Sequence, residues 1–442
     1  MVKGPISLLY KKFNVNEGDR VKIKLIDGRI LSGIIMPKHR FSDERILILK
    51  LDNGYNIGID YSKISEITLI ERKPLIRPAK LPKKPMSEKL PKVVVLGVGG
   101  TILSRVDYRT GAVRSAVSAE ELLDILPEVV NIAEIETKVI MNKYSEHLTA
   151  NDWEKISAEV YKQLARDDVS GVVVLHGTDT LGYTAAAVSF ALRNLSKPVI
   201  LVGSQRSSDR PSSDAASNLI SAIYAAGYSP FAHVMVAMHS ESSDGSIALH
   251  IGTRVRKNHS SRRDAFQSID IKPLGYIIDN TSLKIVWDKY RVRDENRNTL
   301  LKGKFKPKAA LIKFYPSIPP TIMEILVQDN FDAIIIEGSG LGHVGEYLFN
   351  VIKGAIKSGV YVFMTTQCIW GRTNLYVYDT GRELLSMGVI PLENMLSETA
   401  LVKAMWALGN FSKDDLPKIM LTNYEYEITY RSPYAEGRGF QP

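Results

Sequence analysis

The sequence predicts an α/β protein, in which a small N-terminal β-barrel precedes a doubly wound α/β domain in two subdomains. Short strand-like runs with polar turns fill residues 15–70, and a proline-rich stretch covers residues 74–91. Strand-like and helix-like runs then alternate from Lys92 onward, which is typical of a mostly parallel sheet. At 442 residues, the chain is long enough for two or three domains with substantial cores.

The N-terminal barrel is predicted over residues 1–73. The run 21–26 alternates apolar and charged residues, and the Asp27-Gly28 pair after it favours a hairpin turn. About five such strands make a barrel of SH3 or Sm size. The first 91 residues hold 19 Lys and Arg against 10 Asp and Glu, whereas the rest holds 38 of each sign. This excess indicates a polyanionic partner, with an ordinary solvated basic surface as the alternative.

Residues 74–91 form a predicted linker, which contains five prolines and five basic residues. Proline-rich chain extends by ~3.1 Å per residue, so this linker spans roughly 50 Å and makes the barrel a separate module. The α/β region is predicted to consist of four parts. These are a first subdomain with the active site (92–280), a charged connection (281–307), a second subdomain (308–415) and a C-terminal tail (416–442).

Two threonines stand on glycine turns that directly follow apolar strands. One turn is 99–102, after the run 93–96, and the other is 176–180, after the run 172–175. Ligands of open α/β sheets bind at the carboxyl ends of strands, where glycine permits a sharp turn. A threonine hydroxyl held there becomes a nucleophile when a base removes its proton. The pattern therefore predicts hydrolase or acyl-transfer chemistry.

Ordinary structural roles are the alternatives for these turns. A Gly-Gly-Thr sequence also occurs in a plain connection between a strand and a helix. Asp179 can cap the helix that begins near Thr180. His176 is expected to be a buried structural histidine rather than a catalytic one.

The two turns resemble those of bacterial-type L-asparaginases, over about residues 92–415. The resemblance implies four catalytic residues, Thr101, Thr178, Asp179 and Lys257. Asp179 would orient Lys257 as the base, and either threonine can be the nucleophile. We favour Thr101, with Thr178 as its activator or as the partner in the second half-reaction.

A lysine base must lose its proton, which normally stays bound near neutral pH. Burial and nearby cations, here Arg254, Arg256 and Arg262, would favour the neutral amine.

The same resemblance implies three substrate-binding residues. Ser145 and Glu146 align with a Ser-Gln pair that holds the ammonium and carboxylate groups of the amino acid. Glu146 replaces the amide with an acid, which favours an ammonium group but not a carboxylate. Tyr108 lies in a segment similar to the mobile lid of the family, and a plain surface tyrosine is the alternative.

Other kinds of site find no support in the sequence. The segment 338–342 lacks the glycine spacing of a dinucleotide site, and no P-loop motif or metal-ligand spacing occurs. We therefore expect neither a metal nor a cofactor in this chain. Cys368 is the only cysteine, so no intramolecular disulfide can form. Without an apolar run of membrane length, we expect a cytoplasmic protein with no membrane contact.

The whole arrangement is similar to the D subunits of archaeal glutamyl-tRNA(Gln) amidotransferases, and residues 203–214 share that likeness. The resemblance implies a ligase, in which this chain hydrolyses glutamine and an E subunit uses ATP and Mg to convert Glu-tRNA(Gln) to Gln-tRNA(Gln). It also implies a homodimer core within a heterotetramer. The alternatives are a free cytoplasmic L-asparaginase with an accessory β-domain, and a binding protein with a vestigial site.

Overall fold

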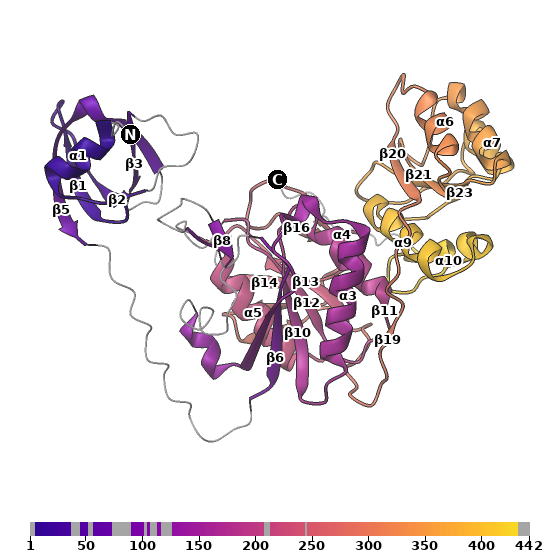
Figure 1. The fold of residues 1–442 in the computed structure, drawn as a ribbon. Helices are drawn as coiled ribbons and strands as arrows, with labels where there is room; N and C mark the ends of the chain where they lie inside the picture. The colour runs from indigo at the N-terminus through magenta and orange to yellow at the C-terminus, as the bar shows by residue number, and fades with distance from the viewer. Residues whose placement is uncertain are drawn as a thin grey trace.

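The computed structural model describes most of the chain, in an N-terminal sheet domain and an α/β region with two main sheets (Figure 1). The described residues are 5–36, 45–51, 56–72, 90–100, 104–106, 113–115, 126–206, 213–243 and 245–431. None of the helices within these ranges is long and apolar enough to cross a membrane.

The N-terminal domain is an antiparallel sheet of five strands, which agrees with the predicted number, and their order is β4-β3-β2-β1-β5. Its elements are α1 (Pro5–Phe13), β1 (Arg20–Leu25), β2 (Ile30–Ile35), β3 (Ile46–Leu51), β4 (Asn56–Asp60), η1 (Tyr61–Lys63) and β5 (Ile64–Glu71). In β1, Val21 and Ile23 are fully buried, while Lys22 between them faces solvent. Helix α1 was not expected from the sequence. Nine residues make a marginal helix alone, and this one buries Ile6 in the core of the sheet.

The first α/β subdomain is built on an eight-stranded sheet in the order β18-β17-β14-β13-β12-β10-β6-β9. Its strands are β6 (Lys92–Gly97), β9 (Glu134–Val139), β10 (Val169–Leu175), β12 (Val199–Val202), β13 (Val234–His239), β14 (Ser246–Ile251), β17 (Gly275–Ile278) and β18 (Ser282–Ile285). The five strands from β9 to β13 are parallel, and the other three pair antiparallel. The strand-like run 138–141 predicts a strand that begins at Lys138, but β9 begins at Glu134, because the charged residues of this half-exposed edge strand hide its start from an apolar pattern.

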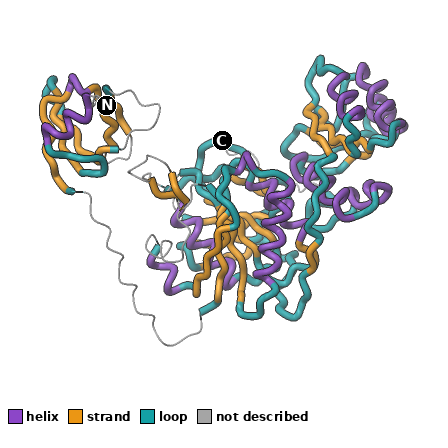
Figure 2. The backbone as a smooth tube through the Cα atoms, viewed as in Figure 1, coloured by secondary structure: helices purple, strands orange, loops and turns teal. Residues whose placement is uncertain are grey.

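Helices cover both faces of this sheet (Figures 1 and 2). Helix α5 (Ala215–Tyr228) packs on one face, while α3 (Ala150–Leu164) and α4 (Leu181–Ala191) pack on the other. Helix α4 is apolar nearly all round because the second subdomain covers its far side, where Phe190 stacks on Trp406. The sequence pattern over 119–131 predicts a helix; residues 119–125 of this range lie outside the described part, and Pro127–Asn131 form the 3₁₀ turn η2.

The second subdomain has a parallel four-stranded sheet in the order β20-β21-β22-β23. Its strands and helices are β20 (Ala309–Lys313), α6 (Thr321–Gln328), β21 (Ala333–Gly338), η4 (Glu346–Leu348), α7 (Phe349–Lys357), β22 (Tyr361–Thr366), α8 (Asp379–Met387), β23 (Ile390–Pro391), α9 (Ser397–Asn410), η5 (Lys413–Asp415) and α10 (Leu416–Leu421). The remaining short elements are β7 (Ser104–Val106), β8 (Val113–Ser115), η3 (Ser145–His147), β11 (Leu192–Arg193), β15 (Val255–Lys257), β16 (Phe266–Ser268) and β19 (Leu300–Leu301).

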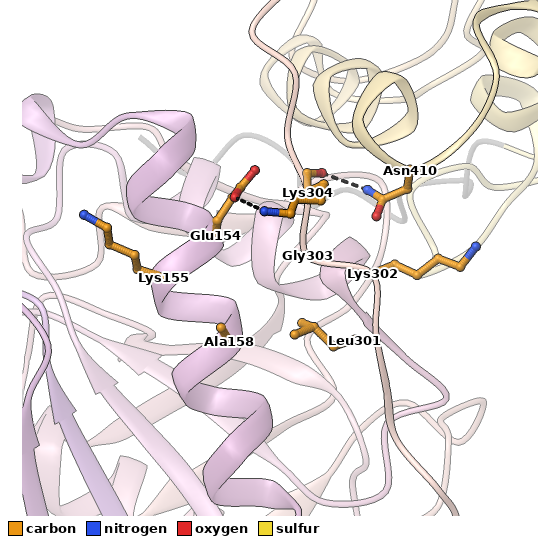
Figure 3. Close-up of a pocket in the computed structure, with 8 residues that line it drawn as sticks. All are labelled: Glu154, Lys155, Ala158, Leu301, Lys302, Gly303, Lys304 and Asn410. Carbon is orange, nitrogen blue, oxygen red and sulfur yellow. Dashed lines mark hydrogen bonds and ion pairs between the residues drawn. The ribbon is translucent and has the colours of Figure 1, made fainter.

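The connection between the subdomains is tied to α3. Lys304 Nζ lies 3.0 Å from Glu154 Oε2, and Asn410 Nδ2 donates to the Lys304 carbonyl at 2.7 Å (Figure 3). A groove of about 500 Å³ lies along these residues, and none of the residues that line it belongs to the predicted active site. It therefore marks the junction rather than the catalytic centre.

Candidate active site

The two glycine turns meet at the carboxyl ends of β6 and β10, which pair in parallel. Gly99 and Gly100 have φ angles of +144° and +90°, which favour glycine. A Cβ at Gly100 would lie 2.7 Å from the Gly177 nitrogen, so the backbones of the turns are in contact. Thr101, the favoured nucleophile, and Tyr108 both lie outside the described residues.

A buried relay of three side chains fixes the second turn. Trp153 Nε1 donates to Thr184 Oγ1 at 3.2 Å, and Thr184 Oγ1 lies 2.8 Å from His176 Nε2. His176 Nδ1 lies 2.6 Å from the Gly177 carbonyl, which can only accept, so Nδ1 carries the proton. Nε2 then accepts from Thr184. Burial lowers the pKa of His176 to about 4, and the ring is neutral near pH 7.

Three of the predicted catalytic residues come together beside this relay. Lys257 Nζ donates to Thr178 Oγ1 at 2.9 Å and to Asp179 Oδ1 at 2.7 Å. The Lys257 side chain is only 14% exposed, whereas that of Asp179 is 67% exposed. Asp179 therefore does not cap α4. The residue at the helix cap is Thr180, whose hydroxyl donates to the Ser145 carbonyl at 2.6 Å.

A third glycine turn, after β12, closes against Thr178. A Cβ at Gly203 would lie 2.9 Å from Thr178 Cγ2, so only glycine fits there without a shift. Buried Asp214 holds this turn, because it accepts from the backbone nitrogens of Gln205 and Arg206, each at 2.9 Å. Sequence reasoning did not assign Gly203 to the site. The available signal was its position, a glycine directly after a fully apolar strand.

Of the predicted substrate-binding pair, Ser145 lies against the second glycine turn and Glu146 is exposed. Ser145 is buried, and a Cβ at Gly177 would lie 2.9 Å from Ser145 Oγ. Glu146, the next residue of η3, is exposed to solvent. Ser145 therefore packs against the second glycine turn, whereas Glu146 faces solvent.

The arginines expected near Lys257 pair with other carboxylates. Arg254 Nη2 lies 3.6 Å from Asp270, Arg256 Nη2 lies 3.2 Å from Glu398, and Arg262 pairs with Asp264. Their charges are thus balanced locally, and the contacts that the structure gives the Lys257 amine are with Thr178 and Asp179.

The arrangement suits acyl transfer. A hydroxyl, an amine and a carboxylate lie in one hydrogen-bonded row, which is the order of nucleophile or activator, base and orienting group. Among the described residues, no three His, Cys, Asp or Glu side chains gather as a metal-binding group.

Family models account for most of the chain. Residues 15–70 match the GatD N-terminal domain. Residues 92–291 match the N-terminal asparaginase domain, and residues 308–420 match the glutaminase/asparaginase C-terminal domain.

Solved structures of similar fold include the thermostable L-asparaginase from Thermococcus kodakarensis, with a TM-score of 0.69 and 34% identity. The match covers 99% of that asparaginase but only 76% of this chain. L-asparaginase I from Vibrio cholerae matches with a TM-score of 0.67 and 27% identity, over 77% of this chain and 99% of its own.

Curated relatives extend over nearly the whole sequence. The D subunit of glutamyl-tRNA(Gln) amidotransferase from Pyrococcus abyssi is 49% identical over 96% of this chain and 97% of its own length. The protein of the same name from Thermococcus kodakarensis is 47% identical over 98% of each. With a likeness this high over both the sheet domain and the α/β region, the chain belongs to the family of glutamyl-tRNA(Gln) amidotransferase D subunits.

Proposed function

We propose that this chain is the glutaminase subunit of a tRNA-dependent amidotransferase, and that a threonine nucleophile hydrolyses glutamine in it. The observation that carries this is the row of Thr178, Lys257 and Asp179, joined at 2.9 Å and 2.7 Å, in a chain of the D-subunit family. Lys257 is the base and Asp179 orients it.

The reaction takes two steps. A threonine oxygen, of Thr101 by preference, attacks the side-chain amide carbon of glutamine, and its proton passes toward Lys257. The C–N bond then breaks, the nitrogen leaves as ammonia with the transferred proton, and a threonine ester remains. Water adds to the ester, which returns the threonine hydroxyl and releases glutamate. Thr178 lies against the base and activates the nucleophile or the water.

Substrate recognition falls to the rim of the site. Glu146 would attract the α-ammonium group of glutamine, and Ser145 and Tyr108 would contact the rest of the amino acid. The backbone carbonyl of Ser145 also accepts a hydrogen bond from the Thr180 hydroxyl, so the position of Ser145 is coupled to the second glycine turn.

The released ammonia has a destination outside this chain. We assign the ATP- and Mg-dependent activation of Glu-tRNA(Gln) to a partner E subunit, in a cytoplasmic heterotetramer with a homodimer of this chain at its core. Formation of a carbon–nitrogen bond at the expense of ATP makes the whole assembly a ligase. The basic N-terminal domain, with Lys22 exposed on β1, is available to the polyanionic tRNA or to the partner.

Free L-asparaginase is the alternative. The solved asparaginases match about three quarters of this chain, whereas the D subunits match nearly all of it, the N-terminal sheet included. This difference favours the amidotransferase.

The test measures ammonia release by the purified full-length chain, with glutamine and asparagine supplied separately. Glutamine turnover that rises when partner subunit and Glu-tRNA(Gln) are added supports the proposal, and rapid turnover of asparagine by the chain alone contradicts it. Thr101→Ala, Thr178→Ala and Lys257→Ala should each lower glutamine turnover by roughly 10³-fold or more. Turnover near the wild-type rate in any variant removes that residue from the mechanism.

A further inference from the structure

The strand that carries Lys257 is short and depends on its neighbours. Strand β15 has three residues and, among the described strands, pairs only with β16, outside the eight-stranded sheet. Directly after Lys257, residues 258–262 are exposed. The pairing with β16 and the ion pair of Arg256 with Glu398 hold the strand itself, and further contacts lie on its N-terminal side.

The chain just before β15 is hydrogen-bonded to the second subdomain and to the terminal segment 423–431. Thr253, which is fully buried, donates through Oγ1 to the Glu425 carbonyl at 2.6 Å. Its own carbonyl accepts from Thr399 Oγ1 of α9 at 2.9 Å. Both contacts reach across the junction between the subdomains.

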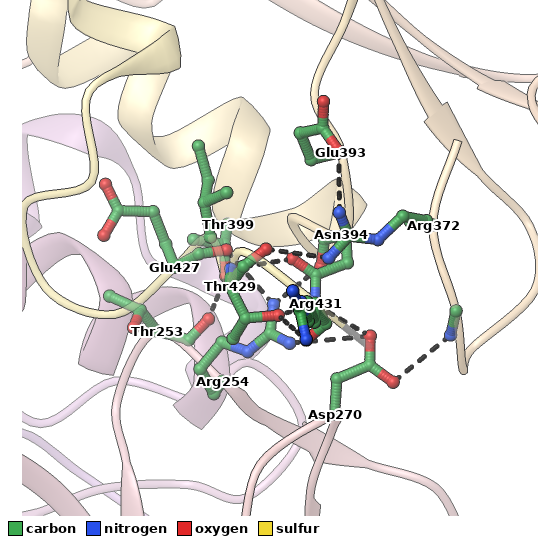
Figure 4. Close-up of polar contacts among 12 residues, drawn as sticks. Thr253, Arg254, Asp270, Arg372, Glu393, Asn394, Thr399, Glu427, Thr429 and Arg431 are labelled. Carbon is green, nitrogen blue, oxygen red and sulfur yellow. Dashed lines mark hydrogen bonds and ion pairs between the residues drawn. The ribbon is translucent and has the colours of Figure 1, made fainter. Parts of the chain in front are cut away.

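Arg254 is the centre of this junction (Figure 4). Its side chain is fully buried, and Nη1 donates to the Asn394 carbonyl at 2.6 Å and to the Glu427 carbonyl at 3.1 Å. Nη2 lies 3.6 Å from Asp270 Oδ2. Burial lowers the pKa of Arg254 to about 10, against the attraction of Asp270, so the guanidinium keeps its charge near pH 7.

Asp270 and Asn394 complete this clamp around Arg254. Asp270 accepts from Asn394 Nδ2 at 3.0 Å and from the Gly371 nitrogen at 3.2 Å. Asn394 also donates to Thr429 Oγ1 at 2.7 Å and accepts from the Thr429 nitrogen at 3.0 Å. One cation thus ties three parts of the chain to the start of β15.

We propose that Arg254 is a positioning residue of the active site, which holds β15 so that Lys257 reaches Thr178 and Asp179. The reach of the base then depends on where the second subdomain and segment 423–431 sit. Arg254 touches no reacting atom, and a displacement of about 1 Å at a catalytic group can cost on the order of 10²-fold in rate. This inference rests on the proposed glutaminase role of Lys257.

The experiment compares Arg254→Met and Arg254→Lys with Arg291→Lys, all in the full-length chain. Arg291 is the matched control, because its guanidinium binds segment 423–431 through Glu425 at 2.9 Å and otherwise donates to the Ala232 carbonyl, away from β15. We expect Arg254→Met to lower kcat for glutamine by roughly 10²-fold, with KM within about threefold. Arg254→Lys should restore part of the loss because it keeps the charge. Arg291→Lys should leave kcat within about twofold of wild type.

A clamp variant covers the case in which Arg254→Met does not fold. Asn394→Ala with Thr429→Val opens the clamp and leaves Arg254 intact, and kcat should fall about tenfold. Equal kcat in the Arg254 variants and Arg291→Lys, or losses that only follow the melting temperature, overturn the inference. A wild-type chain without glutaminase activity, or one insensitive to Lys257→Ala, instead overturns the proposed function.

Discussion

Thr184 stands between a tryptophan and a histidine, and its single hydroxyl serves both. It accepts from Trp153 and donates to His176, which in turn donates to the carbonyl of Gly177. The residue after that carbonyl is Thr178. A side chain with no reacting role thus fixes the backbone from which an active-site hydroxyl projects.

We predict that Thr184→Val lowers kcat for glutamine about tenfold, with KM little changed. The valine leaves His176 Nε2 and Trp153 Nε1 buried without partners, which costs about 1–3 kcal/mol for each polar group. Steady-state ammonia release and thermal unfolding measure the two effects. Thr184→Ser is the control, since it keeps the hydroxyl, and equal behaviour of Thr184→Val and Thr184→Ser would contradict the relay.

Single residues differ in how far the sequence reveals them. Thr178 and Asp179 lie on a glycine turn after an apolar strand, and the family resemblance points to them and to Lys257, so the meeting of the three side chains could be predicted. Thr184 and Trp153 could not, since their contact joins two helices and exists only after packing. The alternative role of Asp179, as the cap of α4, was wrong for a similar reason. Its carboxylate accepts a hydrogen bond from Lys257, which lies far along the chain.

At the scale of elements, the terminal segment 423–431 buries two acidic side chains, Glu425 and Glu427. The side chain of Glu425 is 5% exposed and lies 3.0 Å from Arg193 and 2.9 Å from Arg291. Burial raises the pKa of Glu425, while the two arginines oppose the rise. The negative charge of Glu425 balances the positive charges of Arg193 and Arg291.

We predict that Glu425→Gln lowers the free energy of unfolding by about 3–5 kcal/mol, because two partly buried guanidiniums lose their counter-charge. Chemical denaturation at pH 7 measures the change. Glu295→Gln, which removes an exposed partner of Arg293, is the control and should change stability by under about 1 kcal/mol. Similar losses in both variants would show that burial of Glu425 adds nothing.

At the scale of elements, the sequence predicts a strand where apolar residues either alternate with polar ones or form an unbroken run. The alternating strands of residues 15–70 and the apolar strands β6, β10 and β12 form as predicted. The burial of Glu425 and Glu427 in segment 423–431 could not be predicted, since acidic side chains are mostly exposed in folded proteins. Their partners Arg193, Arg291 and Lys403 come from other elements, and only the folded chain brings these charges together.

At the scale of the whole molecule, three buried histidines link stability to pH. Burial lowers the pKa of His176 to about 4, of His233 to about 3 and of His250 to about 4, against 6.5 for an exposed imidazole. Between these values the unfolded chain binds protons that the native state does not. Stability is therefore full above about pH 6.5 and falls as the pH drops toward 4.

We predict that each histidine costs on the order of 3 kcal/mol by pH 4. His250→Asn should lessen the fall in melting temperature between pH 6.5 and 4, since the asparagine can still bind Ser268 and takes up no proton. The comparison is a series of thermal unfolding curves for wild type and variant. Parallel curves for the two proteins would mean that His250 does not contribute.

A second prediction at this scale concerns the N-terminal domain. Removal of residues 1–89 keeps Pro91 in place beside Gly227, where a Cβ would lie 2.9 Å from the proline ring. Basal glutaminase activity should stay within about twofold, while tRNA amidation by the assembled complex should fall about tenfold and depend less on salt. Unchanged amidation by the shortened chain would show that the basic domain binds neither tRNA nor partner.

The junction at Arg254 also sets an order of events during protein synthesis. The ribosome makes Lys257 early and segment 423–431 only after both subdomains, yet Arg254 and Thr253 bind carbonyls of that late segment. A nascent chain that stops short of Glu425 therefore lacks part of the clamp that aligns its base. Alignment of Lys257 is therefore expected only after segment 423–431 has been translated.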